Sequence, residues 1–321
     1  MKEPLLSVKN LRTYFFSKEK EIRAVDGIDL EVYPGQIVCV VGESGSGKSI
    51  TSLSIMQLIP KPTGQIVSGE IMFDGKDLTK LSEKQIAAIR GNDISMIFQE
   101  PMTSLNPVLT IGDQISEVLL RHRSISKKEA LQKAIEMLQF VGVPRAKEIV
   151  REYPHQLSGG LRQRVMIAMA MICEPKLLIA DEPTTALDVT IQAQVLELMK
   201  KMRDEFHSSI VMITHDLGVV AEIADHVAVM YAGQVVESAD ADSIFEDTLH
   251  PYTNALMESI PSLEEEKDIL YSIPGTVPDA SDFPVGCRFA SRCEMVQPSC
   301  LEKMPELREL KPGHFVRCDL L

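Results

Sequence analysis

The stretch that decides the fold is GESGSGKS, residues 42–49, which matches the phosphate-loop pattern G-x-x-x-x-G-K-[ST]. It follows the continuous apolar run QIVCVVG (36–42), which predicts a buried strand, and it precedes a helical run. The motif requires this context, because its glycines let backbone N–H groups curl around phosphate oxygens where a helix begins. The alternative is a glycine- and serine-rich loop that matches by chance, and the correctly placed strand and helix argue against it.

The individual residues of this loop have distinct expected roles. Lys48 is expected to neutralise the β and γ phosphate oxygens, and the hydroxyl of Ser49 to bind Mg²⁺. The sequence therefore predicts a site for ATP and Mg²⁺. Its expected nucleotide-binding residues are Gly42, Glu43, Ser44, Gly45, Ser46, Gly47, Lys48, Ser49 and Ile50.

A pair of carboxylates follows a second buried strand downstream. In LLIADEP (177–183) four apolar residues lead to Asp181 and Glu182. The C-terminal end of a strand is where open α/β sheets bind ligands. We expect Asp181 to hold Mg²⁺ through water and Glu182 to accept a proton from the attacking water. The alternative is a surface turn at a strand end.

The regions around these motifs indicate an α/β protein. Residues 5–40 predict short strands, and GEIMFDGKDL (69–78) predicts a hairpin that turns at Asp74-Gly75. Residues 110–150 carry apolar residues at helical spacing. Beyond them, helices and strands alternate up to SIVMITHD (209–216), which is typical of a parallel sheet.

Composition excludes several classes of protein. The 321 residues are 45% hydrophobic and 25% charged, as in ordinary globular proteins. A net charge of -13 disfavours a nucleic-acid-binding protein. The longest apolar run, VMIAMAMIC (165–173), is about half of what a bilayer crossing needs. We expect a soluble, cytoplasmic chain, in which disulfides are rare.

A third motif narrows the class of P-loop protein. LSGGLRQR (157–164) is a Ser-Gly-Gly turn that runs into an amphipathic helix, although Ser158 alone could be an ordinary helix cap. Taken in order along the chain, the motifs resemble the ATP-binding cassette of ABC transporters over roughly residues 5–240. Those motifs are residues 42–49, Gln99 in IFQEP, Ser158, Gly159 and Gly160, Asp181 and Glu182, Asp188 in TTALD, and His215 in ITHD.

The resemblance implies that two cassettes face head to tail, with each Ser-Gly-Gly helix closing over the ATP on the other's phosphate loop. It implies that His215 orients the γ-phosphate and Glu182, and that Gln99 contacts Mg²⁺ or the attacking water. Read alone, a histidine or glutamine at such positions is more often structural. Tyr14 matches the aromatic residue that stacks on adenine, and Phe15 or Phe16 could substitute for it.

One residue departs from the family pattern. Leu161 stands where the signature usually has glutamine or a similar residue. We expect this change to weaken, without abolishing, the support that the helix gives to the partner's nucleotide.

The six cysteines fall into two groups. Cys39 lies on a predicted buried strand and Cys173 ends an apolar helix, so both are expected in the core. The other four form C-x₅-C-x₆-C-x₁₇-C in a region rich in proline, and a lobe with so little apolar periodicity needs a staple. They are Cys287, Cys293, Cys300 and Cys318.

Three states of these four thiols remain open: a 4Fe-4S cluster, zinc, or no ligand. Zinc sites usually contain C-x₂₋₄-C pairs, which this spacing lacks, whereas clusters are held by four cysteines. Residues 249–318 resemble the C-terminal extension of ATP-binding subunits in the dipeptide/oligopeptide permease family, some of which carry a 4Fe-4S cluster. The resemblance favours the cluster. Because the lobe has too little core of its own, we expect the cluster to be structural and the cassette to bind ATP without it.

Together the motifs and resemblances predict a complete architecture. Residues 1–240 would form the nucleotide-binding domain, and residues 241–321 the peptide-permease-type extension with the four-cysteine site. The domain would have a P-loop ATPase core with a mainly parallel sheet and flanking helices. It would also have an N-terminal antiparallel β-subdomain and a helical subdomain over about residues 100–160.

The predicted function is ATP hydrolysis that powers an importer of dipeptides or oligopeptides. The chain would lie at the cytoplasmic face of the membrane and contact two transmembrane permease subunits through residues 105–150. It would pair with a second homologous ATP-binding subunit or with itself, and would depend indirectly on an extracytoplasmic peptide-binding protein. The alternatives are a nickel or oligosaccharide importer, a soluble ABC ATPase, or a P-loop regulatory protein. A P-loop regulatory protein would lack the Ser-Gly-Gly helix.

Overall fold

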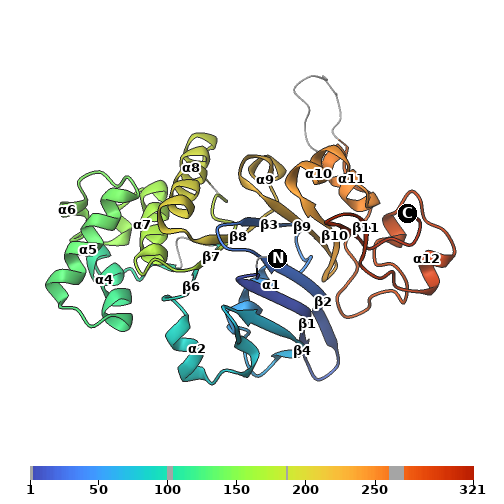
Figure 1. Ribbon diagram of the computed structural model, residues 1–321, viewed down its shortest axis with the longest axis horizontal. Coiled ribbons are helices and arrows are strands. Elements are labelled where there is room, and N and C mark those ends of the chain that lie inside the picture. The colour runs from blue at the N-terminus through green and yellow to red at the C-terminus, as the bar shows by residue number, and fades with distance from the viewer. Residues whose placement is uncertain (1–2, 100–103, 186, 260–270) are drawn as a thin grey trace. The chain divides into compact units, whose positions relative to one another are not determined.

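The computed structural model describes residues 3–99, 104–185, 187–259 and 271–321 (Figure 1). Contacts group the chain into two compact units, which are described separately. The first comprises Met1–Tyr33, Ile37–Thr79 and Ile213–Leu321, and the second comprises Pro34–Gln36 and Lys80–Met212. Parts of three predicted motifs lie outside the described residues, namely Glu100 and Pro101 of IFQEP, Ala186 of TTALD, and residues 260–261 of the C-terminal motif.

A small antiparallel sheet begins the first unit, with strand order β2-β1-β4-β5. Its last two strands form the predicted hairpin, in which Phe73 pairs with Lys76. Asp74 and Gly75 at the turn have φ of 47° and 74°, the left-handed values that such a turn demands. The antiparallel subdomain predicted from the sequence is confirmed. Its strands are β1 (Leu6–Phe16), β2 (Glu21–Val32), β4 (Gly64–Phe73) and β5 (Lys76–Asp77).

Five strands of a larger sheet also belong to the first unit, in the order β11-β12-β10-β9-β3 (Figure 1). Strand β3, Ile37–Val41, is buried at every residue, as its continuous apolar run predicted, and it pairs in parallel with β9. The other four are β9 (His226–Tyr231), β10 (Gln234–Asp240), β11 (Arg308–Lys311) and β12 (His314–Val316). The other described elements of this unit before residue 240 are helices α1 (Lys48–Ile55) and α9 (Leu217–Ile223) and the short turn η1 (Leu78–Lys80).

Strand pairing and a buried carboxylate hold the residues after 240 against this sheet, and the sequence analysis predicted neither contact. Strands β11 and β12 form a hairpin, and β12 pairs antiparallel with β10, so the end of the chain extends the sheet. The carboxylate of Glu237 on β10 is fully buried and accepts hydrogen bonds from the backbone of Leu249 and His250 and from the His314 ring. The other elements here are α10 (Ala241–Glu246), α11 (Pro251–Glu258), η3 (Ala290–Arg292) and α12 (Ser299–Glu302).

The second unit contains the predicted helices and three strands in the order β8-β7-β6. Thr110 caps α4 and Ser126 caps α5, each through its side-chain oxygen, and these caps explain where the two helices begin. The helices are α2 (Glu83–Ile89), α4 (Ile111–His122), α5 (Lys127–Phe140), α6 (Ala146–Ile149), η2 (Pro154–Gln156), α7 (Gly159–Met171) and α8 (Val189–Phe206). The strands are β6 (Ile94–Ile97), β7 (Leu177–Asp181) and β8 (Ser209–Thr214), of which β6 and β7 are parallel.

Two sequence expectations about buried residues are confirmed. Cys39 is fully buried and Cys173 is 4% exposed, so both are core residues. Burial raises the pKa of Cys39 and of Cys173, which keeps both thiols protonated at neutral pH. Among the described residues, no helix has the length and apolar character needed to cross a membrane.

Candidate functional site

The phosphate loop joins β3 to α1, and two of its glycines are required by close backbone contacts. A Cβ at Gly42 would lie 2.1 Å from the carbonyl oxygen of Met230, and one at Gly47 would lie 2.5 Å from that of Ala24. Both glycines have positive φ, at 149° and 101°. Gly45, also at positive φ, faces open space, with no atom within 4 Å of its added Cβ. The loop therefore has the backbone shape and the open side that a phosphate group needs.

Lys48 is aimed back at this loop. Its Nζ donates to the carbonyl oxygens of Gly42 at 2.7 Å and Glu43 at 3.0 Å, and the residue is only 6% exposed. The loop is closed on itself by a bond from the backbone N–H of Ser46 to the Glu43 carbonyl, and Gly233 donates to the Ser46 carbonyl. The ammonium group is thus fixed at the loop, where it can neutralise phosphate oxygens.

In the second unit, the structure brings Gln99 and Glu182 together. Gln99 Nε2 donates to Glu182 Oε2 at 2.9 Å, although the residues are 83 positions apart. Thr185 Oγ1 donates to the same oxygen at 2.9 Å. Asp181, at the end of β7, is 5% exposed, and Glu182 has a positive φ of 48°. The sequence analysis missed Thr185, whose signal is its place in TTALD three residues after Glu182.

Ser158 begins helix α7, and the ordinary capping role that the sequence allowed is present. Its side chain accepts a hydrogen bond from the backbone N–H of Leu161 at 3.4 Å. Gly159 faces open space, whereas a Cβ on Gly160 would contact the side chain of Ile191 at 3.4 Å. The start of this helix therefore keeps one bare glycine open to a ligand. Leu161 contributes its backbone to the cap.

Two further contacts fix the elements around Glu182. Gln163 is buried and its Nε2 donates to the carbonyl oxygen of Pro183 at 2.6 Å, which ties α7 to the residue after the proposed base. Asp188 caps α8 by accepting from the N–H of Ile191 at 2.9 Å. Gln163 was not predicted as a site residue. Its place three residues after Gly160, the last residue of the Ser-Gly-Gly turn, is the sequence signal that could have found it.

His215, one of the predicted site residues, lies in the first unit. His215 follows β8 and is exposed, and its neighbour Asp216 caps α9 through the backbone N–H groups of Gly218 and Val219. An exposed imidazole at a strand end is accessible to a ligand.

The side chain of Tyr14 contacts other residues of the first unit. Its hydroxyl donates to Asp26 Oδ1 at 2.7 Å, and the Arg23 guanidinium lies 5.9 Å from its ring centre. Burial, and next the bond to Asp26, raise the pKa of Tyr14. The residue is 9% exposed, whereas Phe16 is 36% exposed. Of these two residues, both of which the sequence offered as adenine contacts, Phe16 is the more exposed.

The four C-terminal cysteines all line one small cavity of about 20 Å³. The backbone N–H of Cys287 donates to the Cys300 carbonyl at 2.7 Å, which brings the two segments together. Burial, and among smaller influences the other cysteines, raise the pKa of Cys287, Cys293 and Cys318. Within the described part of the chain, no three or more His, Cys, Asp or Glu side chains are arranged to hold a metal ion. The four thiols therefore share one cavity, but they are not arranged as the ligands of the metal site that the sequence predicts.

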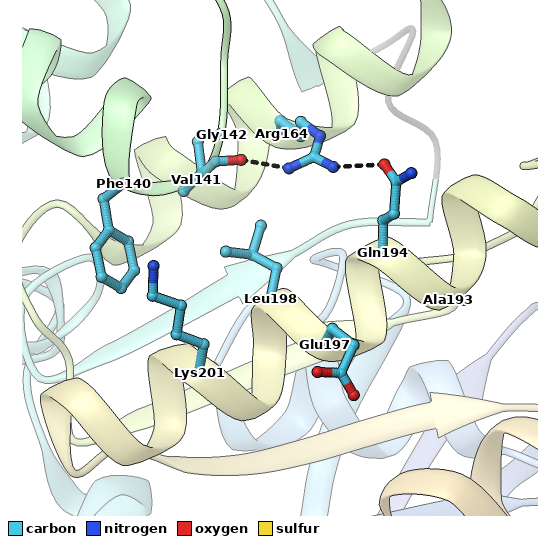
Figure 2. Close-up of a pocket in the computed structure, with 9 residues that line it drawn as sticks. All are labelled: Phe140, Val141, Gly142, Arg164, Ala193, Gln194, Glu197, Leu198 and Lys201. Carbon is cyan, nitrogen blue, oxygen red and sulfur yellow. Dashed lines mark hydrogen bonds between the residues drawn. The ribbon is translucent and has the colours of Figure 1, made fainter.

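A larger cavity of about 600 Å³ lies in the second unit, between the end of α5 and helices α7 and α8 (Figure 2). Arg164 donates there to the Val141 carbonyl and to Gln194 Oε1, and the Lys201 ammonium lies over the Phe140 ring at 4.3 Å. None of the predicted nucleotide-binding residues lines this cavity. It is distinct from the sites built by the motifs.

Comparison with known protein families gives two matches that divide the chain. Residues 25–185 match the family ABC transporter, and residues 236–300 match the family Oligopeptide/dipeptide transporter, C-terminal region. This chain belongs to the ABC transporter family. The first match includes the phosphate loop, Gln99, the Ser-Gly-Gly helix and Glu182, and the second includes three of the four C-terminal cysteines.

Named relatives of this ABC protein match over nearly their whole length. "Oligopeptide transport ATP-binding protein AppD" of Bacillus subtilis (strain 168) is 60% identical over 98% of this chain and 96% of its own. "Oligopeptide transport ATP-binding protein OppD" of the same organism is 52% identical over 99% of this chain and 89% of its own. A solved dimer of the ATP-binding cassette MJ0796, bound to ADP and Pi, is 28% identical with a TM-score of 0.66. It covers 74% of this chain and 98% of its own.

The family settles the activity and the fold of this ABC protein. It is an ATPase with the α/β cassette fold and an antiparallel β-subdomain, as the sequence predicted. ATP and Mg²⁺ fit the site, since the loop has the open cradle and the fixed lysine that bind a triphosphate. Neither the family matches nor the relatives' names mention iron or zinc.

Proposed function

We propose that this ABC ATPase powers an importer of dipeptides or oligopeptides. The observation that carries the cargo assignment is the match of residues 236–300 to the C-terminal region of oligopeptide/dipeptide transporters, because this segment lies outside the cassette common to ABC proteins. The names of the two relatives, which both describe oligopeptide transport, support a peptide cargo.

An uptake experiment tests the cargo. A strain that lacks this chain is expected to lose uptake of a labelled tripeptide, to regain it with the wild-type chain, and to remain deficient with Glu182→Gln. Uptake of nickel and of an oligosaccharide is measured in parallel. Unchanged peptide uptake together with lost nickel or sugar uptake would establish the alternative importer and contradict the proposal.

The proposed chemistry assigns one task to each group around the nucleotide. Lys48 neutralises the β and γ phosphate oxygens, while Ser49 and, through water, Asp181 hold Mg²⁺. Glu182 accepts the proton of the attacking water, and its bonds to Gln99 and Thr185 orient the carboxylate for that task. Bound Mg²⁺ would supply the charge compensation that the phosphate oxygens need.

Residues outside the phosphate loop complete the proposed site. His215 orients the γ-phosphate, and the adenine base stacks on an aromatic residue of Tyr14–Phe16, among which the exposures of Tyr14 and Phe16 favour Phe16. Ser158, Gly159 and Gly160 receive the γ-phosphate of a facing cassette, because a helix N-terminus attracts anions.

We propose that the cassette, up to residue 240, pairs with a second homologous ATP-binding subunit or with itself. Two transmembrane permease subunits would dock on residues 105–150, which hold the chain at the cytoplasmic face of the membrane. An extracytoplasmic peptide-binding protein would deliver the cargo. Purification from native membranes is expected to recover two permease subunits and a second ATPase with this chain. Recovery of the chain in the soluble fraction alone would favour a soluble ABC ATPase.

We further propose that Cys287, Cys293, Cys300 and Cys318 bind a structural 4Fe-4S cluster. The support is that four thiols, the donor set of such clusters, line one cavity. The cavity of about 20 Å³ has room for about one water molecule, so the thiols would have to separate to admit a cluster. A single zinc ion would require less separation, and it remains the alternative.

Anaerobic purification tests the cluster. The full chain is expected to be brown and to contain about four irons, as four-thiolate clusters do. Cys293→Ser is expected to bleach it and to expose residues after 250 to protease, whereas Cys39→Ser, in the core, should keep the colour. Colourless protein with one zinc would establish zinc. Four freely alkylated thiols on a protease-resistant chain would show that no metal is bound.

A further inference from the structure

The second residue of the phosphate loop, Glu43, is held by residues of the C-terminal region from two directions. Its backbone N–H donates to the hydroxyl of Tyr252 on α11 at 2.9 Å. Its carboxylate oxygens accept from Arg292, with Nη1 at 2.8 Å from one and Nη2 at 3.1 Å from the other. A two-point contact of this kind fixes both the position and the direction of the carboxylate.

Arg292 is itself rigidly placed. Its side chain is only 4% exposed. Nε donates to the Pro274 carbonyl at 2.7 Å, and Nη2 to the Ile273 carbonyl at 3.3 Å. Nη1 lies 3.4 Å from the Tyr231 hydroxyl. Because two carbonyl oxygens of the C-terminal region and the Tyr231 hydroxyl of β9 hold the planar guanidinium, the orientation that it imposes on Glu43 depends on the C-terminal region.

The hydroxyl of Tyr252 is equally constrained. Tyr252 is fully buried, and its ring packs against Tyr231 at 4.6 Å and Phe289 at 5.3 Å between ring centres. Burial raises the pKa of Tyr252, so the hydroxyl stays neutral and can accept from the Glu43 N–H. The backbone and the side chain of one loop residue are therefore both anchored outside the cassette.

The charge of Glu43 gives this anchor a consequence for nucleotide binding. A carboxylate on the loop that receives a triphosphate would repel the ligand, in a chain whose net charge is already -13. Arg292 lies against that carboxylate and compensates its charge. The compensating charge is permanent, because an arginine guanidinium stays protonated in proteins.

We propose that Arg292 is a positioning residue for nucleotide binding, which neutralises and fixes Glu43 so that the affinity of the phosphate loop for ATP depends on the C-terminal region. This inference rests on the proposed role of residues 42–49 in binding the triphosphate. It concerns the folded C-terminal region and leaves open our expectation that the cassette binds ATP without the cluster. Arg292 directly precedes Cys293, which lines the cysteine cavity.

Four full-length proteins test this inference: wild type, Arg292→Ala, Arg292→Ala combined with Glu43→Gln, and Arg308→Ala. Arg308 is the matched control, since it binds the carbonyl oxygens of Cys318 and Leu321 in the same region and does not touch the loop. The Kd for trinitrophenyl-ATP is measured by fluorescence, and KM and kcat by phosphate release. Circular dichroism and thermal unfolding report whether each variant is folded.

Arg292→Ala is expected to raise the Kd roughly tenfold, or about 1.4 kcal/mol, with KM rising in parallel and kcat changing less than about twofold. The added Glu43→Gln is expected to restore most of the affinity, because the uncompensated carboxylate is gone. Arg308→Ala should bind like wild type. If Arg292→Ala does not fold, Arg292→Lys keeps the charge but not the two-point contact, and is expected to raise the Kd less than tenfold.

Three results would overturn the inference: a folded Arg292→Ala with a Kd within twofold of wild type, a double variant as weak as the single one, or an equal loss in Arg308→Ala. If Arg292→Ala does not fold, an Arg292→Lys variant that binds like wild type together with an Arg308→Ala variant that binds weakly would also overturn it. Failure of the proposed role of the loop is recognised separately. It would appear as unchanged nucleotide affinity in Lys48→Ala, whatever Arg292→Ala does.

Discussion

Glu237→Gln tests how the C-terminal region is anchored to the sheet. Glu237 is fully buried, and Oε1 accepts from the N–H of Leu249 at 2.8 Å and from His314 Nε2 at 2.7 Å, while Oε2 accepts from the N–H of His250 at 3.0 Å. Glutamine has the same shape but only one acceptor oxygen. In its better orientation it keeps Leu249 and His314 satisfied and turns an NH₂ group toward the N–H of His250.

The magnitude follows from this one lost acceptor. A buried N–H left without a partner costs about 1–3 kcal/mol, so Glu237→Gln is expected to lower the free energy of unfolding by about 2 kcal/mol. Denaturant unfolding measures the change, and limited proteolysis is expected to cut after residue 240 first. Glu309→Gln is the control, because Glu309 is exposed on β11, in the hairpin that pairs with β10, and binds the N–H of Gly313.

The control is expected to stay within about 0.5 kcal/mol of wild type. The reasoning is refuted if Glu237→Gln unfolds at the same denaturant concentration as wild type and Glu309→Gln. It is also refuted if the variant loses stability while proteolysis begins in the second unit.

The remaining predictions concern the nucleotide site and pH. Glu182→Gln should keep ATP affinity and reduce hydrolysis on the order of 10²–10⁴-fold, the usual contribution of a general base; turnover near the wild-type rate would contradict it. Lys48→Ala should weaken nucleotide binding itself in a titration, because the ammonium compensates ground-state charge; a slower rate at unchanged affinity would argue against this. Burial lowers the pKa of His250 to about 3. The unfolded chain therefore takes up this proton first below about pH 6.5, and stability should fall by up to about 1.4 kcal/mol per pH unit from there toward pH 3. In His250→Asn, which retains a capping oxygen, unfolding should depend less steeply on pH, and an unchanged slope would exclude His250 as the cause.

Local elements could be predicted from the sequence because neighbouring residues encode them. The turn at Asp74-Gly75 needs two left-handed residues in succession, and Asp-Gly supplies them. Thr110 and Ser126 precede helical apolar patterns and cap the helices that follow. The glycines of the phosphate loop are fixed by motif chemistry in the same way. These features depend on a few adjacent residues and can therefore be predicted without the tertiary structure.

The sequence by itself determined the class of this protein, since ordered motifs for an ATP-binding cassette and the spacing of its cysteines can be read along the chain. Only the tertiary structure decided which distant residues meet. Gln99 bonds to Glu182, Glu237 receives the backbone at 249 and 250, and Arg292 reaches Glu43 across 249 positions. An arginine at the end of a single short turn has no periodicity or capping pattern that identifies its partner. That partner is selected when the whole chain closes, because burying a charge is tolerated only where an opposite charge is brought to meet it.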